Sequence, residues 1–326
     1  MNKHTQQNIH SIPNEFMHRY FHENAERRFA TELNDFLFWR KGKFLRPNEK
    51  EKIIASYLKE EIDDFFINKK IHIPRLQFFI TSACTLRCSE CNALIPDLHR
   101  PFSPVKNYFL NEKDFKRDLE ILATAVSSIR HFILLGGEPL LHKNINKLIS
   151  IALKSSIISS IEIITNGTVI PPAEVLEEMK KYIDRVFFRI SDYSPNPQLS
   201  TVLRHEELEE LFKEHGFKYQ KTFMPWFRCL APEPLQDDEK TRKVFKNCYM
   251  GRCVQVFDGR LAICAKASSL DALTSHKNRD GDIIDLRQEQ NLHQALLHFY
   301  EKDFFNACRM CSGYGEEILP GIQRES

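Results

Sequence analysis

Short apolar runs alternate with amphipathic segments over the middle of the chain. The apolar runs include RLQFFIT, HFILL, IEIIT and RVFFRI, and a short polar or glycine-containing stretch follows each of them. The segments between them have the apolar spacing of helices that pack against a sheet. Because short apolar strands that alternate with such helices are typical of a parallel sheet, the pattern predicts an α/β core. The expected strands are residues 75–81, 131–135, 161–165, 185–190 and 219–224.

Four helices are expected between these strands. Asn111 is placed to cap the first of them, with Glu112 and Asp114 in its first turn. Curved into a closed or nearly closed shape, the sheet would be a partial (β/α)6 TIM-like barrel. The polar stretches would then lie at the carboxyl ends of the strands, where barrel enzymes carry their catalytic groups. The expected helices are residues 111–128, 142–155, 171–182 and 199–215.

The regions on either side of this alternation have a different character. Residues 1–72 are polar and rich in Phe, with helical periodicity, and predict a helical N-terminal extension. Residues 73–228 form the expected barrel. Residues 229–326 contain six cysteines and an expected hairpin, and they predict a small hairpin-plus-helix domain.

Charge and cysteine usage narrow the class of protein. Lys and Arg total 46 while Asp and Glu total 44, so neither nucleic acid nor an anionic membrane is expected as a partner. The amino-terminal stretch has no apolar core of a signal peptide, and no run of about 18 apolar residues predicts a membrane span. The nine cysteines fall into two groups, at 84–91 and 229–311. In a chain of this length, that grouping indicates metal binding in a reducing cytoplasm.

Three cysteines lie close together after the first expected strand. Cys84, Cys88 and Cys91 have the spacing C-x3-C-x2-C. Three thiolates on one loop can bind three irons of a [4Fe–4S] cluster, which leaves the fourth iron open for another ligand. A structural zinc site is an alternative, but it needs a fourth Cys or His, and none lies close in the sequence. Buried thiols in a core strand are a second alternative, which the polar neighbours Arg87 and Glu90 disfavour.

A second motif, Gly136-Gly137-Glu138-Pro139, follows the second expected strand. Two glycines let the backbone approach a ligand closely, and Glu138 offers a carboxylate to an ammonium group. Alone, the tetrapeptide could equally be a turn with a capping acid. The three-cysteine loop after the first strand and this motif after the second together resemble the radical S-adenosylmethionine (SAM) superfamily, over about residues 73–225.

That resemblance implies a reaction and a set of ligands. The open iron would bind the amino and carboxyl groups of SAM. One electron would then cleave SAM to methionine and a 5′-deoxyadenosyl radical, which abstracts a hydrogen atom from a C–H bond. A barrel mouth that excludes water would protect such a radical. The SAM-binding residues that the resemblance implies are Gly136, Gly137, Glu138, Pro139, Asn166, Ser191 and Asp192.

One position departs from the family pattern. Family members often carry an aromatic residue just before the third cysteine, where it helps to seat the adenine of SAM. This chain has Glu90 there, so the adenine contact is not assigned to that position. Phe79 and Tyr193 are candidates to replace it.

The second group of cysteines resembles a further part of the same superfamily. The spacing from Cys248 to Cys264, followed later by Cys308-x2-Cys311, is similar to the SPASM/twitch extension of radical SAM enzymes. That resemblance implies one auxiliary Fe–S cluster, of the [4Fe–4S] type, bound by these four cysteines. Zinc bound by four cysteines and purely structural thiols are the alternatives.

Cys253 competes with Cys248 as a ligand. Residues 255–263 predict a hairpin that turns at Asp258-Gly259, a pair favoured in two-residue turns. With such a turn, position 253 lies opposite Cys264, and side chains opposed in this way are roughly 5 Å apart. The hairpin geometry therefore favours Cys253, whereas the family spacing favours Cys248.

Cys229 follows the fifth expected strand, near the expected mouth of the barrel. A thiol in that place can donate a hydrogen atom to a substrate radical, which is how radical SAM epimerases of this type complete their reaction. An incidental cysteine is the alternative.

These residues and the resemblance predict a radical SAM enzyme of the oxidoreductase or epimerase type. Its substrate would be small and polar, such as a sugar, an aminocyclitol or a nucleotide sugar, and a flavodoxin or ferredoxin would be its electron donor. Modification of a ribosomal peptide is the alternative among enzymes. A non-catalytic Fe–S binding or electron-carrier protein is the alternative from another class.

Overall fold

The computed structural model describes residues 71–228, 235–248, 253–273, 281–313 and 315–324. The helical extension expected over residues 1–72 therefore lies almost entirely outside the described residues, as does Cys229. Within the described ranges, no helix has the length and apolar character needed to cross a membrane.

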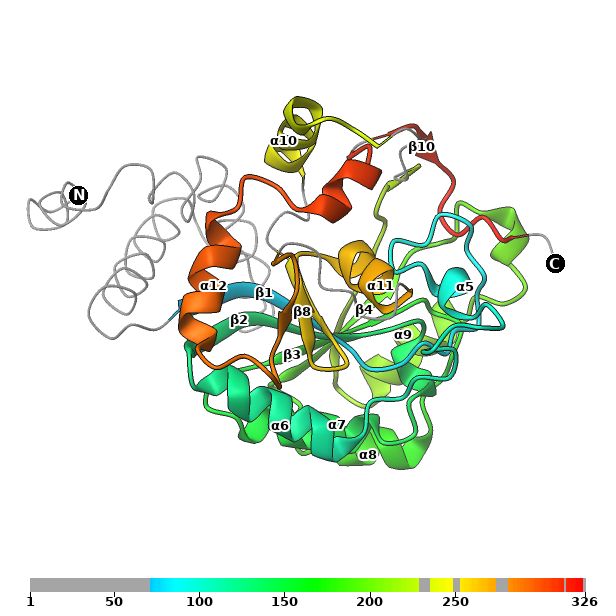
Figure 1. The fold of residues 1–326 in the computed structure, drawn as a ribbon. Coiled ribbons are helices and arrows are strands. Elements are labelled where there is room, and N and C mark those ends of the chain that lie inside the picture. Colours follow the sequence, from blue (N-terminus) through cyan, green and yellow to red (C-terminus); the bar gives the residue numbers. More distant parts are fainter. Residues whose placement is uncertain (1–70, 229–234, 249–252, 274–280, 314, 325–326) are drawn as a thin grey trace, which may run out of the picture.

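An eight-stranded sheet forms the centre of the fold (Figure 1). Its strand order is β5-β4-β3-β2-β1-β7-β8-β9. Each neighbouring pair from β5 through β7 is parallel, while β8 is antiparallel to both of its neighbours. The predicted α/β fold with a parallel core is thus confirmed. The strands are β1 (Ile71–Phe79), β2 (Val126–Leu135), β3 (Ile161–Thr165), β4 (Val186–Ser191), β5 (Lys218–Thr222), β7 (Cys253–Phe257), β8 (Arg260–Ala262) and β9 (Ile284–Asp285).

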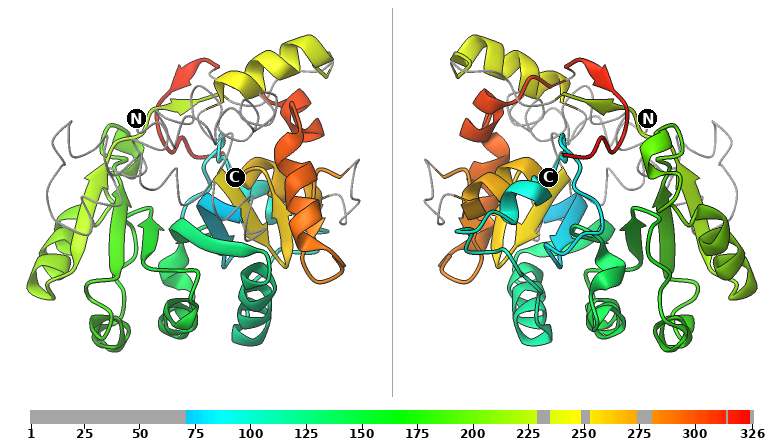
Figure 2. Two further views of the ribbon diagram at one scale, coloured as in Figure 1. Left: turned by 90° about the vertical axis from the view of Figure 1, so that its left-hand side faces the viewer. Right: turned by 90° about the vertical axis from the view of Figure 1, so that its right-hand side faces the viewer.

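Four helices follow the first four strands and cover one face of the sheet (Figure 2). They are α6 (Glu112–Ala123), α7 (Ile145–Lys154), α8 (Ala173–Lys180) and α9 (His205–Glu214). The predicted cap of α6 is present, because the Asn111 side chain accepts the backbone N–H of Asp114 at 2.9 Å. The remaining elements are α5 (Ile95–Leu98), α10 (Asp238–Asn247), α11 (Ala265–Leu273), α12 (Leu292–Glu301) and a two-stranded pair of β6 (Trp226–Phe227) with β10 (Glu317–Ile318).

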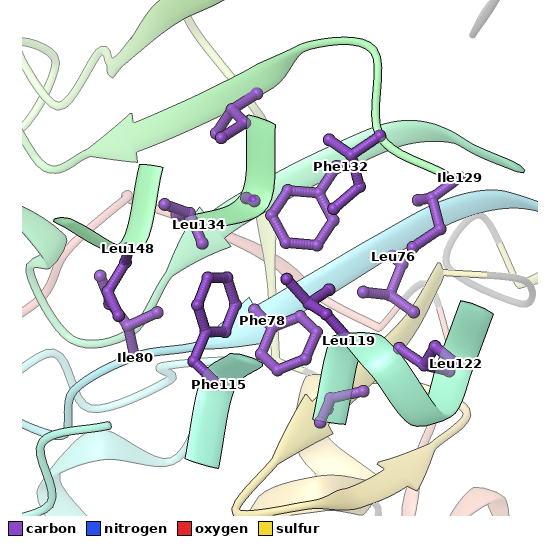
Figure 3. Packing of buried hydrophobic residues seen from close by; sticks show 14 of the residues in the cluster. Leu76, Phe78, Ile80, Phe115, Leu119, Leu122, Ile129, Phe132, Leu134 and Leu148 are labelled. Atoms are coloured by element: carbon purple, nitrogen blue, oxygen red, sulfur yellow. The ribbon is translucent and has the colours of Figure 1, made fainter. Parts of the chain in front are cut away.

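The core lies between the sheet and these four helices (Figure 3). Alternate residues of β1, such as Leu76 and Phe78, point to the helical side and are almost fully buried. The ring of Phe78 meets the edge of Phe115 from α6 at a centroid distance of 4.9 Å. Such apolar burial, worth about 25 cal/mol for each Å² removed from water, fixes which face of each strand turns toward the helices. The face of the sheet opposite these helices is therefore available to line a functional site.

β7 and β8 form the predicted hairpin. Asp258 and Gly259 have φ angles of 47° and 73°, as a two-residue hairpin turn with positive φ at both positions requires. Phe257 therefore pairs with Arg260. β7 also pairs in parallel with β1, which makes the hairpin a continuation of the barrel sheet. Within the region expected as a small C-terminal domain, β7 is thus hydrogen-bonded to the first strand of the sheet.

Arg287 fastens the hairpin to the first helix of the barrel. Its guanidinium contacts both carboxylate oxygens of Asp118, at 2.9 and 3.0 Å, and reaches Asp258 in the hairpin turn at 2.9 Å. Asp118 lies on α6 and is fully buried. Because an unpaired buried carboxylate is costly, this bidentate contact restricts how the hairpin can sit against the barrel.

Candidate functional site

A cavity of about 230 Å³ lies at the carboxyl ends of the first four strands. The loops that follow β1, β2, β3 and β4 each contribute to its wall. Seven residues expected from the sequence line it, namely Cys84, Cys88, Cys91, Gly136, Gly137, Asn166 and Ser191. The sheet thus brings the cysteine loop, the glycine motif and the ends of two further strands around one space.

Tight local turns shape the cysteine loop. The N–H of Cys91 donates to the carbonyl of Cys88 at 3.3 Å, and the N–H of Leu94 donates to that of Cys91 at 2.9 Å. Leu94 has a φ of 51°, which turns the chain into α5. Burial, with a smaller contribution from negative charge on Cys91, raises the pKa of the Cys84 and Cys88 thiols to about 12. The three thiols are therefore near enough to influence one another.

Gly136 and Gly137 lie directly against the backbone of the cysteine loop. The N–H of Gly137 donates to the Thr81 carbonyl at 2.8 Å. A Cβ atom on Gly136 would lie 2.2 Å from that carbonyl oxygen, and one on Gly137 would lie 2.3 Å from the Ala83 oxygen and 2.7 Å from the Cβ of Cys84. Only residues without side chains allow this approach. The glycines thus give the cysteine loop its position, in addition to lining the cavity.

Glu138 is fully buried and does not line the cavity. Its carboxylate accepts three hydrogen bonds, from the N–H of Leu140 at 3.0 Å, the hydroxyl of Thr165 at 2.9 Å and the N–H of Asn166 at 2.7 Å. Burial raises its pKa to about 7, although these donors act against the rise. The sequence suggested that this carboxylate meets the ammonium of SAM. In the structure it joins the loop after β2 to the end of β3, and the adjacent Pro139 is buried beside it.

Asn166 connects the end of β3 to the cysteine loop. Its side-chain N–H groups lie 3.1 Å from the hydroxyl of Thr85 and 3.7 Å from the sulfur of Cys84. Its side-chain oxygen accepts from the N–H and the hydroxyl of Thr168, at 3.0 and 2.6 Å. The side chain therefore lines the cavity in a fixed orientation, with its donors toward the cysteines.

The two site residues expected at the end of β4 have different positions relative to the cavity. Ser191 lines the cavity, whereas Asp192 is not part of the lining. The Asp192 carboxylate accepts the N–H of Ser194 at 3.0 Å and lies 3.9 Å from Nδ1 of His205. Asp192 therefore stabilises the loop that leads to α9.

Several lining residues were missed or left undecided by the sequence reasoning. Tyr193 and Trp226 line the cavity, with their rings perpendicular at a centroid distance of 5.7 Å. Gln77 comes from the middle of β1, and Ala265 begins α11. Strand alternation could have indicated Gln77, because it shares a face with the residues that lead into the loop. Nothing in the sequence connects Ala265 with the barrel before the pairing of β7 with β1 is known.

Four cysteines of the second group occupy neighbouring ends of helices. Cys248 ends α10, Cys264 precedes α11, and Cys308 and Cys311 lie in and just after a short 3-10 helix at Asn306–Met310. Burial, with smaller contributions from the negative charges of Cys248 and Cys311, raises the pKa of Cys264 to about 12. Cys253 lies on β7, paired with Arg75 of β1, and is almost fully buried.

The donor set of the first loop fits a cubane cluster. Among the described residues, no three His, Cys, Asp or Glu side chains converge closely enough to share one metal ion. A [4Fe–4S] cluster instead places each thiolate on a different iron, so its ligands surround a space. Cys84, Cys88 and Cys91 line one cavity together, which is the arrangement that such a cluster needs.

Comparison with known proteins identifies the class of domain. Residues 78–225, a little under half of the chain, match the family model described as the Radical SAM superfamily. The chain therefore contains a radical SAM domain, and the matched region extends from the last two residues of β1 through β5. This domain implies a [4Fe–4S] cluster and SAM as cofactors.

Individual relatives match part of the chain. A GTP 3',8-cyclase from Desulforamulus reducens is 31% identical over 130 residues, which cover 40% of this chain and 38% of the relative. A GTP 3',8-cyclase from Aquifex aeolicus is 30% identical over 151 residues, which cover 44% of this chain and 45% of the relative. The chain thus spans less than half the length of the curated relatives it matches. Among solved structures, native anSMEcpe with bound AdoMet is 14% identical, with a TM-score of 0.47 over 73% of this chain and 88% of that one.

The close approach at Gly137 makes a testable prediction. Gly137→Ala should push the cysteine loop away from the motif, because its Cβ would overlap the Ala83 oxygen. We expect the variant to lose most of the iron at this site after anaerobic reconstitution. Gly216→Ala is the control for a glycine substitution that strains the backbone (φ 75°) away from the site, since Gly216 lies after α9 and a Cβ there would meet Ile183 at an ordinary 3.4 Å. Full iron binding by Gly137→Ala would contradict the prediction.

Proposed function

We propose that this protein is a radical SAM enzyme that abstracts a hydrogen atom from a small polar substrate. The observation that carries the proposal is the shared cavity. Three thiols of one loop, the backbone of Gly136 and Gly137, and Asn166 and Ser191 all line it. Oxidation or epimerisation is the proposed outcome, and Cys229 is the proposed hydrogen donor in the second case.

The residues around the cavity would have different roles in binding the cluster and SAM. Cys84, Cys88 and Cys91 would hold the cluster, which when bound supplies the electron that cleaves SAM. The backbone around Gly136 and Gly137 faces the cavity, where the methionine part of SAM would bind. Glu138 would act indirectly, by fixing that backbone to the end of β3.

Tyr193 is the proposed aromatic neighbour of the adenine. It lines the cavity together with Trp226, so the two rings form an apolar wall that would exclude water from a radical. Phe79 is not suited to that contact, because it is fully buried and stacks on Phe257 at 4.3 Å.

The polar character of the sheet supports a small polar substrate. Gln77 lines the cavity, and Gln255 is its partner across the β1–β7 pairing. Both are buried, and the side-chain oxygen of Gln77 and both polar atoms of Gln255 have no hydrogen-bond partner among the described residues. An unsatisfied buried polar group costs about 1–3 kcal/mol. A ligand that offers both donors and acceptors would remove that cost.

A charged group on the neighbouring strands extends this polar face. Glu162 of β3 is nearly fully buried between Arg189 of β4 and His131 of β2, each at 2.7 Å. Burial opposes its ionisation, but the positive charges of Arg189, His131 and Arg75 outweigh this and hold its pKa well below the usual value. A sheet face with such groups suits a hydrophilic molecule. The relatives named for GTP also support a small polar substrate, and they make a radical cyclisation the second candidate reaction.

We also propose an auxiliary Fe–S cluster on Cys248, Cys264, Cys308 and Cys311. Negative charge on Cys248 acts on both Cys264 and Cys308, which supports Cys248 as the fourth ligand. Lys266 is buried, and its ammonium lies 3.9 Å from the sulfur of Cys311. This contact places a buried basic side chain beside the group, where it would compensate the negative charge of a thiolate-bound cluster.

Cleavage of SAM tests the main proposal. Anaerobically purified protein incubated with SAM and dithionite should form 5′-deoxyadenosine, since the open iron gives SAM a binding position. The product is measured by liquid chromatography with mass spectrometry. Cys88→Ala is the control and should form none. Equal product from both proteins, or no product from a wild-type protein that carries its iron, would refute the enzymatic role.

Iron content distinguishes the candidates for the auxiliary site. The wild-type protein should bind about eight irons, as two [4Fe–4S] clusters do. Cys248→Ala should reduce this to about four, because the auxiliary cluster would lose one of its four protein ligands. Cys253→Ala should keep about eight. The reverse result would make Cys253 the ligand and Cys248 the spare thiol.

The unpaired state of Gln255 predicts a gain in stability on its removal. Gln255→Leu should raise the thermal midpoint of the ligand-free protein by roughly 2 °C, because about 1 kcal/mol of desolvation cost is relieved. Calorimetry on the cluster-loaded protein measures the shift. Gln220→Leu, at an exposed site on β5, is the control and should give no gain. A fall in the midpoint for Gln255→Leu would mean that its amide already has a partner.

A further inference from the structure

The segment of residues 320–324 pairs with the cysteine loop. The N–H of Ser89 donates to the carbonyl of Ile322 at 2.7 Å, and the N–H of Arg324 donates to the carbonyl of Arg87 at 2.8 Å. Cys88, between them, forms an antiparallel bridge with Gln323. The backbone on both sides of one cysteine is thus paired with a segment more than two hundred residues away in the sequence.

The side-chain amide of Gln323 lies beside the sulfur of Cys88. Its oxygen accepts the N–H of Arg87 at 2.7 Å, which leaves the nitrogen of the amide directed at the sulfur of Cys88, 3.5 Å away. The same nitrogen donates to the carbonyl of Gly321 at 2.6 Å. Because the oxygen must face the Arg87 donor, the network itself assigns the orientation of the amide.

Contacts on either side hold the segment in place. Asn196 donates to the carbonyl of Pro320 at 2.9 Å. At the other end, the guanidinium of Arg324 contacts both oxygens of Asp97, at 2.7 and 3.2 Å, and Asp97 is a nearly buried residue of α5. Gly321 has a φ of 67°, and a Cβ there would lie 2.8 Å from the Leu199 side chain. The amide donor is therefore part of a fixed strap, defined as residues 320–324.

We propose that Gln323 is a positioning residue that raises the reduction potential of the cluster held by Cys88. The inference rests on the proposed [4Fe–4S] site. On reduction, one electron enters the cluster from an external donor of the flavodoxin or ferredoxin class, and negative charge builds up on its sulfurs. A hydrogen bond to a cluster sulfur stabilises that charge and so favours the reduced state. The strap makes this donor available at one of the three thiolates, that of the buried Cys88.

Two variants test the proposal by measuring the cluster itself. Gln323→Leu removes the donor. Gln323→Glu keeps an oxygen for the Arg87 N–H but places negative charge beside the sulfur. In a redox titration followed by electron paramagnetic resonance, the reduction equilibrium constant should fall about threefold or more for Leu, the effect of one lost hydrogen bond, and further for Glu. Gln198→Glu, an exposed residue near Leu199, is the control for charge alone and should change it little.

The outcomes separate the inference from the function it rests on. A wild-type protein that binds no [4Fe–4S] cluster would contradict both. A wild-type protein with a normal cluster, and Gln323 variants with full iron and an unchanged potential, would contradict the inference alone. Loss of iron in Gln323→Glu would also count against it, because that variant keeps the contact to Arg87, and the proposal gives Gln323 a tuning role and not a retaining one.

Discussion

The buried carboxylate of Glu138 is the interaction on which the site depends. The carboxylate accepts hydrogen bonds from its own loop and from the end of β3. The backbone N–H of Glu138 donates to the carbonyl of Ala83 in the cysteine loop at 2.8 Å. One residue therefore fixes the loops after β1, β2 and β3 relative to one another. Since each of its hydrogen bonds is shielded from water, losing the carboxylate would leave several buried donors unsatisfied and release all three loops together.

The pairing of β7 with β1 connects these three loops to the second half of the chain. β1 leads into the cysteine loop, and β7 begins the hairpin that leads to Cys264 and α11. The first cysteine loop and the hairpin that leads to Cys264 thus extend from adjacent strands of one sheet, which are joined by backbone hydrogen bonds. The bidentate contact between Arg287 and Asp118 restricts the hairpin from the other side.

The sequence predicted the elements more reliably than the roles of single residues. β3 has the predicted bounds, because its apolar run coincides with its paired length. β2 begins earlier than predicted, at Val126, because its polar first half is held by pairing with β1 and not by hydrophobicity. Seven predicted site residues line the cavity, but two of the partners of Glu138 could not be foreseen, since Thr165 and Asn166 lie at and just after the end of β3. The burial of Gln255 depends likewise on pairing between strands far apart in sequence.

Consecutive residues at the start of α11 face different parts of the site, which links the cavity to the second cysteine group. Cys264 lies among the cysteines of the second group, and Ala265 lines the cavity beside the first. Any change that frees Cys264 would therefore move a wall of the cavity as well. Loss of turnover in a Cys264 variant could then arise from altered SAM or substrate binding without any role in electron transfer. Potentials and binding constants measured on the same variant are needed to separate these two effects.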